Sequence, residues 1–156
     1  MATLNIIILT ALLPLLSTTT QNIEKAFLQN NPKILYSLFS YESSVNISLP
    51  EPISFSDQLS NQQAYFLFRK IFSSFTTFEF YSERELPILS EEKSFIFKAR
   101  WSFIDNKNNN QHVIHIFFYL MKEKTKKNRG SHARSHQKNE ESRYEWKIIE
   151  IKAEKI

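Results

Sequence analysis

The order of the apolar segments is the feature that most constrains what this chain can fold into. Apolar residues recur at helical spacing first, at Asn22–Phe39 with a break at Asn30-Asn31, and again at Asn61–Phe72. Alternating, aromatic-rich runs follow at Thr76–Ser82, Ser94–Ile104, His112–Met121 and Tyr144–Ala153. Helices first and strands later within 156 residues predict one α+β domain in which a curved sheet wraps around helices.

Local signals predict where these elements begin and end. Pro32 suits the first turn of a helix, because its missing N–H is not needed there. Ser60 followed by Gln63 is a capping-box pattern, which predicts a helix start. Val45–Leu49 alternates as a short half-buried strand does. The change of phase within Tyr144–Ala153 predicts a β-bulge or a strand that is covered on both sides.

The composition excludes several classes of function. Gly130 is the only glycine, so glycine-rich phosphate loops and dinucleotide fingerprints are excluded. The absence of cysteine removes disulfides, thiolate metal sites and a cysteine nucleophile. Fourteen phenylalanines predict a packed core rather than a disordered chain.

The first twenty residues look like a secretory signal peptide. Leu4–Leu16 is mostly apolar but shorter than the roughly 20 residues that a spanning helix needs. Pro14 and the small residues Ser17–Thr20 suit a cleavage region. We therefore expect a signal peptide at 1–20, a domain at 21–156, no transmembrane span, and an exported location, periplasmic or secreted. A buried N-terminal helix is the alternative.

A basic segment separates the last two strands. Lys122–Arg143 holds eight Lys/Arg and three Glu, and we expect a solvated hairpin loop at 122–143. Without aromatic residues for base stacking, it gives no reason to expect nucleic acid. His132 and His136 have a spacing that can bind a metal on a helix, but no third ligand is near, so no metal site is expected.

Two patterns at the ends of the chain point to a known fold. The first is a helix, a short polar break and a second helix that ends in an aromatic, carried by Ala26-Phe27, Asn30-Asn31 and Leu38-Phe39. The second is the closing strand Tyr144-Glu145-Trp146-Lys147-Ile148-Ile149. Together they resemble the nuclear transport factor two-like superfamily, whose fold is a cone of helices packed on a strongly curved, mostly antiparallel sheet. The middle stretch, Ser60–Phe80, is similar to small exported bacterial domains of unknown function in that superfamily.

The chain departs from the pattern of the enzymes in that superfamily. Its helix break is Asn30-Asn31 where the family commonly has Gly-Asp. The resemblance implies acidic residues and histidine inside the cone of an enzyme, but the chain has only two aspartates, Asp57 and Asp105, and neither matches a catalytic place. No catalytic residue and no cofactor is therefore expected.

Candidate ligand-binding residues lie on the expected strands. Phe97, Trp101 and Tyr119 are either core residues or the lining of a cone mouth that holds an apolar ligand. His115 shares a face with Tyr119 and can join such a pocket. As a general base it would need a partner carboxylate, which no spacing implies. His112 lies on the other side of the pleat, so the two histidines cannot share a ligand.

The sequence favours an exported, non-catalytic domain that binds a small apolar ligand or a protein partner. The resemblance also implies a homodimer through the sheet. Two alternatives stay open. One is an isomerase or hydrolase that uses the cone as a dry pocket, and the other is an adaptor that docks its basic loop on an acidic surface.

Overall fold

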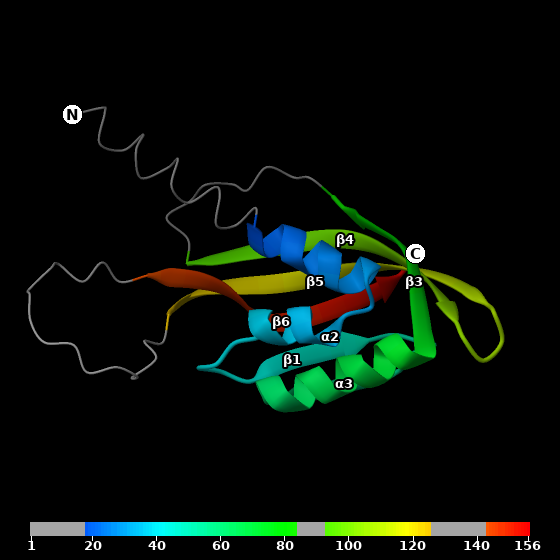
Figure 1. Cartoon of the computed structure of the whole chain (residues 1–156), viewed down its shortest axis with the longest axis horizontal. Coiled ribbons are helices and arrows are strands. Elements are labelled where there is room, and N and C mark those ends of the chain that lie inside the picture. The colour runs from blue at the N-terminus through cyan, green and yellow to red at the C-terminus, as the bar shows by residue number, and fades with distance from the viewer. Residues whose placement is uncertain (1–17, 84–92, 126–142) are drawn as a thin grey trace, which may run out of the picture.

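The computed structural model describes residues 18–83, 93–125 and 143–156, which form three helices and one open six-stranded sheet (Figure 1). A helix over residues 18–28 comes first. The labelled elements follow as α2 (Pro32–Leu38), β1 (Val45–Leu49), β2 (Phe55–Leu59), α3 (Asn61–Ser74), β3 (Phe75–Ser82), β4 (Ser94–Asp105), β5 (Gln111–Lys124) and β6 (Tyr144–Lys155). The predicted α+β class, with helices packed on a curved sheet, is confirmed.

The sheet is mostly antiparallel and has the strand order β2-β1-β6-β5-β4-β3. Only β1 and β6 pair in parallel; the other neighbours are antiparallel. The helices lie on one side of the sheet (Figure 1). Most of the expected signal peptide (1–17) and of the expected basic loop (126–142) lies outside the described residues.

The polar break between the first two helices has a structural cause. Asn30 has a φ of 47°, a left-handed conformation that asparagine adopts more readily than most residues. Its side chain donates to the carbonyl of Phe75 at 3.1 Å and accepts from the N–H of Thr77 at 3.2 Å. Asn31 then caps α2, and Pro32 occupies its first turn as predicted. The break therefore ties the helices to β3.

The predicted capping box at the start of α3 is present. The Ser60 hydroxyl accepts from the N–H of Gln63 at 3.2 Å, and the Gln63 side chain accepts from the N–H of Ser60 at 2.9 Å. The helix runs to Ser74, two residues beyond the predicted end. Its buried side chains are Ala64, Phe68, Ile71 and Phe72.

A fully buried phenylalanine, Phe27, lies at the centre of the core. Its ring centroid is 4.8 Å from that of Phe80, 4.9 Å from Trp101 and 5.6 Å from Phe118. Rings at these separations are in van der Waals contact and contribute beyond their buried area. Phe27 thus joins the first helix to β3, β4 and β5, and Ile23 and Ala26 of the same helix are buried beside it in the core.

Two local features differ from the prediction. Strand β2 was not predicted, because it is a mostly exposed edge strand in which only Phe55 and Leu59 are partly buried. Simple alternation along Thr76–Ser82 would also place Phe78 and Phe80 on one side of β3. A register shift between Thr77 and Glu79 leaves Phe78 44% exposed, whereas Phe80 is buried.

The predicted irregularity in the last strand is confirmed. Tyr119 pairs with Glu150, but the next residue, Leu120, pairs with Ile148. Ile149 is therefore the extra residue of a bulge.

The helix over 18–28 has a bearing on the expected cleavage site. It includes residues 18–20, and Thr19 is buried. Cleavage after residue 20 would remove these residues from the helix.

Candidate functional site

The four predicted ligand-binding residues lie on opposite faces of the sheet. Paired residues on neighbouring strands share a face, and Phe97 and Trp101 pair with the buried residues Phe118 and Ile114. His115 pairs with Arg100, and Tyr119 pairs with Ile96. We call the first face, against the helices, the inner face and the second the outer face. The structure thus groups Phe97 with Trp101 and separates both from His115 and Tyr119.

The inner face around Trp101 is filled by protein. Its indole N–H donates to the Thr77 hydroxyl at 2.9 Å, and its ring lies 4.3 Å from that of Phe103. His112 also lies on this face, where it stacks on Phe103 with a centroid separation of 5.5 Å. Its Nε2 atom is buried without a hydrogen-bond partner among the described residues. As the spacing predicted, His112 and His115 lie on opposite faces.

The outer face is made by four neighbouring strands and is not covered by any described helix (Figure 1). Its central column, on β5, is half-buried. The face comprises Val113, His115, Phe117 and Tyr119 on β5, Ile96, Lys98 and Arg100 on β4, Glu150, Lys152 and Glu154 on β6, and Glu79 and Tyr81 on β3. Tyr81 is 58% exposed and Ile96 is 53% exposed. Large apolar side chains on a broad uncovered surface are typical of an interaction site.

Charged groups on the outer face are held in place by local contacts. Glu83, just after β3, lies 2.8 Å from the Lys98 ammonium and 3.6 Å from Nε2 of His115. The Lys98 ammonium also lies 5.7 Å from the centre of the Phe117 ring. On β6, Lys152 and Glu154 are 3.3 Å apart. Exposed pairs of this kind contribute little to stability, typically below about 1 kcal/mol, but they set where each charge is presented.

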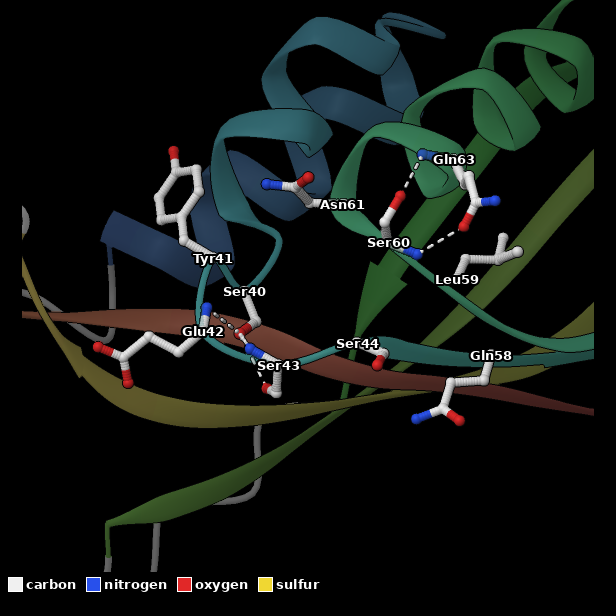
Figure 2. Close-up of a pocket in the computed structure, with 10 residues that line it drawn as sticks. All are labelled: Ser40, Tyr41, Glu42, Ser43, Ser44, Gln58, Leu59, Ser60, Asn61 and Gln63. Atoms are coloured by element: carbon white, nitrogen blue, oxygen red, sulfur yellow. Dashed lines mark hydrogen bonds between the residues drawn. The ribbon is translucent and has the colours of Figure 1, made fainter.

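A second candidate lies at the end of the molecule where α3 begins. Figure 2 shows this polar pocket, which has a volume of about 420 Å³. It lies between the α2–β1 connection and the junction of β2 with α3. It is lined by Ser40, Tyr41, Glu42, Ser43, Ser44, Gln58, Leu59, Ser60, Asn61 and Gln63.

Two buried charged residues support the rim of the polar pocket. The Glu123 carboxylate, 5% exposed, accepts from the Ser40 hydroxyl and from the N–H of Tyr41. The Lys147 ammonium, 6% exposed as a residue, donates to the carbonyl of Ser37 at 2.8 Å. It also lies 4.6 Å from the centre of the Tyr41 ring. These contacts fix the start of the α2–β1 connection against β5 and β6.

This support was not predicted from the sequence, because the partners lie 83 and 110 positions apart. For Lys147 one signal was available, namely a lysine inside the otherwise apolar run Trp146–Ile149. Glu123 has no such signal, since it lies among the charged residues at the end of β5.

Neither a metal-binding cluster nor a membrane-spanning helix is present in the part of the chain that the structure describes. It contains no cluster of three or more His, Asp or Glu side chains suited to hold a metal ion. Nor does it contain a helix long and apolar enough to cross a bilayer. His132 and His136 lie outside this part of the chain.

Comparison of the whole fold with solved structures finds clear likenesses. A ketosteroid isomerase-like protein from Erwinia carotovora atroseptica superposes with a TM-score of 0.60 at 8% identity, covering 92% of this chain and 95% of its own. An NTF2-like protein of unknown function in nutrient uptake from Rhodospirillum rubrum gives 0.57 at 9% identity, with coverages of 90% and 97%. A DUF4783 family protein from Bacteroides ovatus gives 0.55 at 13% identity, with coverages of 86% and 93%.

At the level of sequence, no family model and no curated protein matches the chain. The likenesses in structure, at these identities, show the fold and not the activity. The chain has the nuclear transport factor two-like (NTF2-like) fold. The resemblance drawn from its two terminal patterns is therefore confirmed for the fold.

Proposed function

We propose that this chain is a non-catalytic binding domain that docks a second copy of itself through the outer face of its sheet. One observation carries the proposal: the outer face is four strands wide and no described helix covers it. Its half-buried aromatic column consists of His115, Phe117 and Tyr119 on β5. Isolated exposed apolar residues are common, but here Val113, Phe117 and Tyr119 form a half-buried row that the exposed Ile96 and Tyr81 extend to the neighbouring strands.

The outer face is large enough to form the centre of an interface. Strands lie about 4.8 Å apart and rise about 3.3 Å per residue. Four strands, taken along Val113–Tyr119, the stretch of β5 that the face spans, therefore cover roughly 440 Å². A standard interface buries about 800 Å² on each partner. The face thus supplies about half of the area that a specific dimer needs, and the surrounding surface supplies the rest in this proposal.

One pair of charges on the outer face is complementary across a two-fold axis. Arg100 lies on β4 and Glu154 lies on β6, on opposite sides of β5 and both at the level of His115. A second copy turned by 180° about an axis parallel to β5 places its β6 over the β4 of the first. Arg100 then faces the partner's Glu154, as an isologous interface allows. Lys98 meets the partner's Lys152, and each of these lysines is paired within its own chain, with Glu83 and Glu154.

The inner face supports the non-catalytic part of the proposal. An apolar ligand at Phe97 and Trp101 would have to displace the rings that already fill this space. The enzyme alternative needs a carboxylate or histidine in an enclosed cavity. The histidine on the described inner face, His112, does not line such a cavity in this proposal, because its ring is stacked on Phe103. His115 and Tyr119 therefore belong, in this proposal, to the docking face.

Export remains part of the proposal and rests on the apolar stretch Leu4–Leu16. Sequencing the N-terminus of the protein recovered from its own cells tests it. A first residue near Gln21 supports export, and a first residue at Met1 or Ala2 opposes it.

The experiment for the docking proposal is sedimentation velocity of the purified chain over a range of concentrations. We expect a monomer–dimer equilibrium that Phe117→Glu shifts to monomer, because a charge replaces the centre of the aromatic column. Phe66→Glu is the matched control, since Phe66 is 51% exposed on α3 and lies away from the outer face. A wild-type monomer at all concentrations, or equal effects of the two substitutions, would contradict the proposal.

A further inference from the structure

We infer that the polar pocket binds a neutral, polyhydroxylated ligand of the size of one or two sugar units. The inference is independent of the proposed dimer, because the pocket lies where α3 begins, whereas the outer face is centred on β5. Its volume, about 420 Å³, falls within the range of about 300–1,000 Å³ that is usual for small-molecule sites.

The chemistry of the lining selects this class of ligand. Hydroxyl, amide and phenol groups dominate it, and no lysine, arginine or histidine belongs to it. An anionic ligand would find no cation to pair with. An apolar ligand would find Leu59 as the only aliphatic side chain in the lining. Amides and hydroxyls both donate and accept hydrogen bonds, as the hydroxyl groups of a sugar also do.

The one charged lining residue stands apart from the others. Figure 2 shows the Glu42 carboxylate pointing away from the side chains at the start of α3. The Asn61 side chain extends from the first turn of α3 toward the side of the pocket where Tyr41 stands. A neutral interior with a carboxylate at its edge suits an uncharged ligand better than a phosphate or carboxylate.

The lining divides into groups that build the pocket and groups that are available to a ligand. Ser60 and Gln63 are used by the capping box, and the Ser40 hydroxyl is used by Glu123 and by the N–H of Ser43. The side chains of Ser44, Gln58 and Asn61 make no hydrogen bond to any described residue. The lining thus offers a hydroxyl and two primary amides that no described residue binds; of the amides, Asn61 points toward Tyr41, whereas Gln58 points to the other side of the strand (Figure 2).

The pocket is also held in its shape before a ligand arrives. Glu123 fixes Ser40 and the backbone at Tyr41, and the Lys147 ammonium lies over the Tyr41 ring. Tyr41 remains 46% exposed, so its ring still offers an aromatic surface at the pocket edge. A rim fixed in this way loses little conformational freedom on binding, which favours affinity.

The test is a titration of the ¹⁵N-labelled full chain by NMR with three probes: maltose, N-acetylglucosamine and inorganic phosphate. We expect at least one of the two sugars to shift amide signals of residues 40–44 and 58–63 and to leave those of β5 in place. Phosphate should shift none of them. No response to either sugar, or a response to phosphate alone, would overturn the inference.

A pair of substitutions on adjacent residues sharpens the test. Asn61→Ala removes an available amide and should weaken sugar binding about tenfold, the equivalent of one good hydrogen bond. Gln62→Ala, at an exposed neighbour outside the pocket lining, should leave binding unchanged. Equal affinities of the two variants would also overturn the inference. Because neither residue is buried, both variants should fold, which the ¹⁵N spectrum itself shows.

Discussion

Phe118 and Phe117 are neighbours on β5, yet their surroundings differ completely. Phe118 is fully buried against Phe27 and Phe97, whereas Phe117 is half-buried on the outer face beneath the Lys98 ammonium. Alternation along the strand creates both faces. The inner face packs against other parts of the same chain, whereas no described residue covers the outer face. The same residue type therefore supports the fold at one position and presents a surface at the next.

The largest expected effect breaks the inner face. Phe27→Ala should lower the free energy of unfolding by about 3–5 kcal/mol, because it leaves a cavity between the first helix and three strands. Leu28→Ala is the matched control, since Leu28 is 46% exposed, and should change stability by less than about 0.5 kcal/mol. Urea unfolding followed by circular dichroism measures both. Similar losses for the two variants would mean that the inner face is not the core.

The next effect concerns the polar support at the end of the sheet. Glu123→Ala should destabilise the chain by about 2–3 kcal/mol, because the Ser40 hydroxyl and the N–H of Tyr41 lose their buried acceptor. Glu51→Ala, in an exposed pair with Lys155 away from the outer face, should have an effect within about 0.5 kcal/mol. The same urea titration compares them. A Glu123 variant as stable as the Glu51 variant would show that the carboxylate does not hold the rim.

A charge reversal tests how the outer faces meet. Arg100→Glu should weaken the proposed dimer about tenfold or more, because it sets like charges against the acidic residues of the partner's β6. Combining it with Glu154→Arg should restore part of the lost affinity. Sedimentation equilibrium gives the dissociation constants. A double variant weaker than either single variant would reject the proposed orientation of the two copies.

The smallest effect lies at the start of α3. Ser60→Ala should cost about 1 kcal/mol through the loss of the cap, and it should leave the dimer unchanged, because the pocket and the outer face are separate. Gln62→Ala again serves as the control. Thermal unfolding detects the first effect and sedimentation the second. A loss of dimer in the Ser60 variant would show that the start of α3 and the outer face are coupled, contrary to this expectation.

Local sequence signals predicted much of the fold. The Asn30-Asn31-Pro32 break, the capping box at Ser60 and the bulge in the last strand depend on residues close in sequence, and the structure contains all three. Strand β2 was missed for a related reason. An edge strand needs only one paired side and little burial, so Phe55–Leu59 lacks the apolar alternation that marks a strand.

The candidate sites were less predictable than the fold. Periodicity placed Trp101 and Phe97 on one face of β4, but it could not show that Phe27 and Phe103 fill the space beside Trp101. It also could not show that His115 and Tyr119 face the other side of the sheet from Trp101. That relation depends on the register between β4 and β5, which no local pattern specifies.

The contacts that shape the polar pocket are more distant still. Glu123 meets Ser40 only because β6 brings the α2–β1 connection and β5 to the same end of the sheet. Such a contact follows from topology and not from spacing.

The most direct test of the proposed dimer is hydroxyl-radical footprinting of the purified chain at its lowest and highest workable concentrations. We expect oxidation of Phe117 and Tyr119 to fall as concentration rises, because a second copy covers the outer face. Oxidation of Tyr65 and Phe66 on α3 should stay constant. Unchanged oxidation of Phe117 and Tyr119 at both concentrations, or protection of α3 instead, would contradict the proposal.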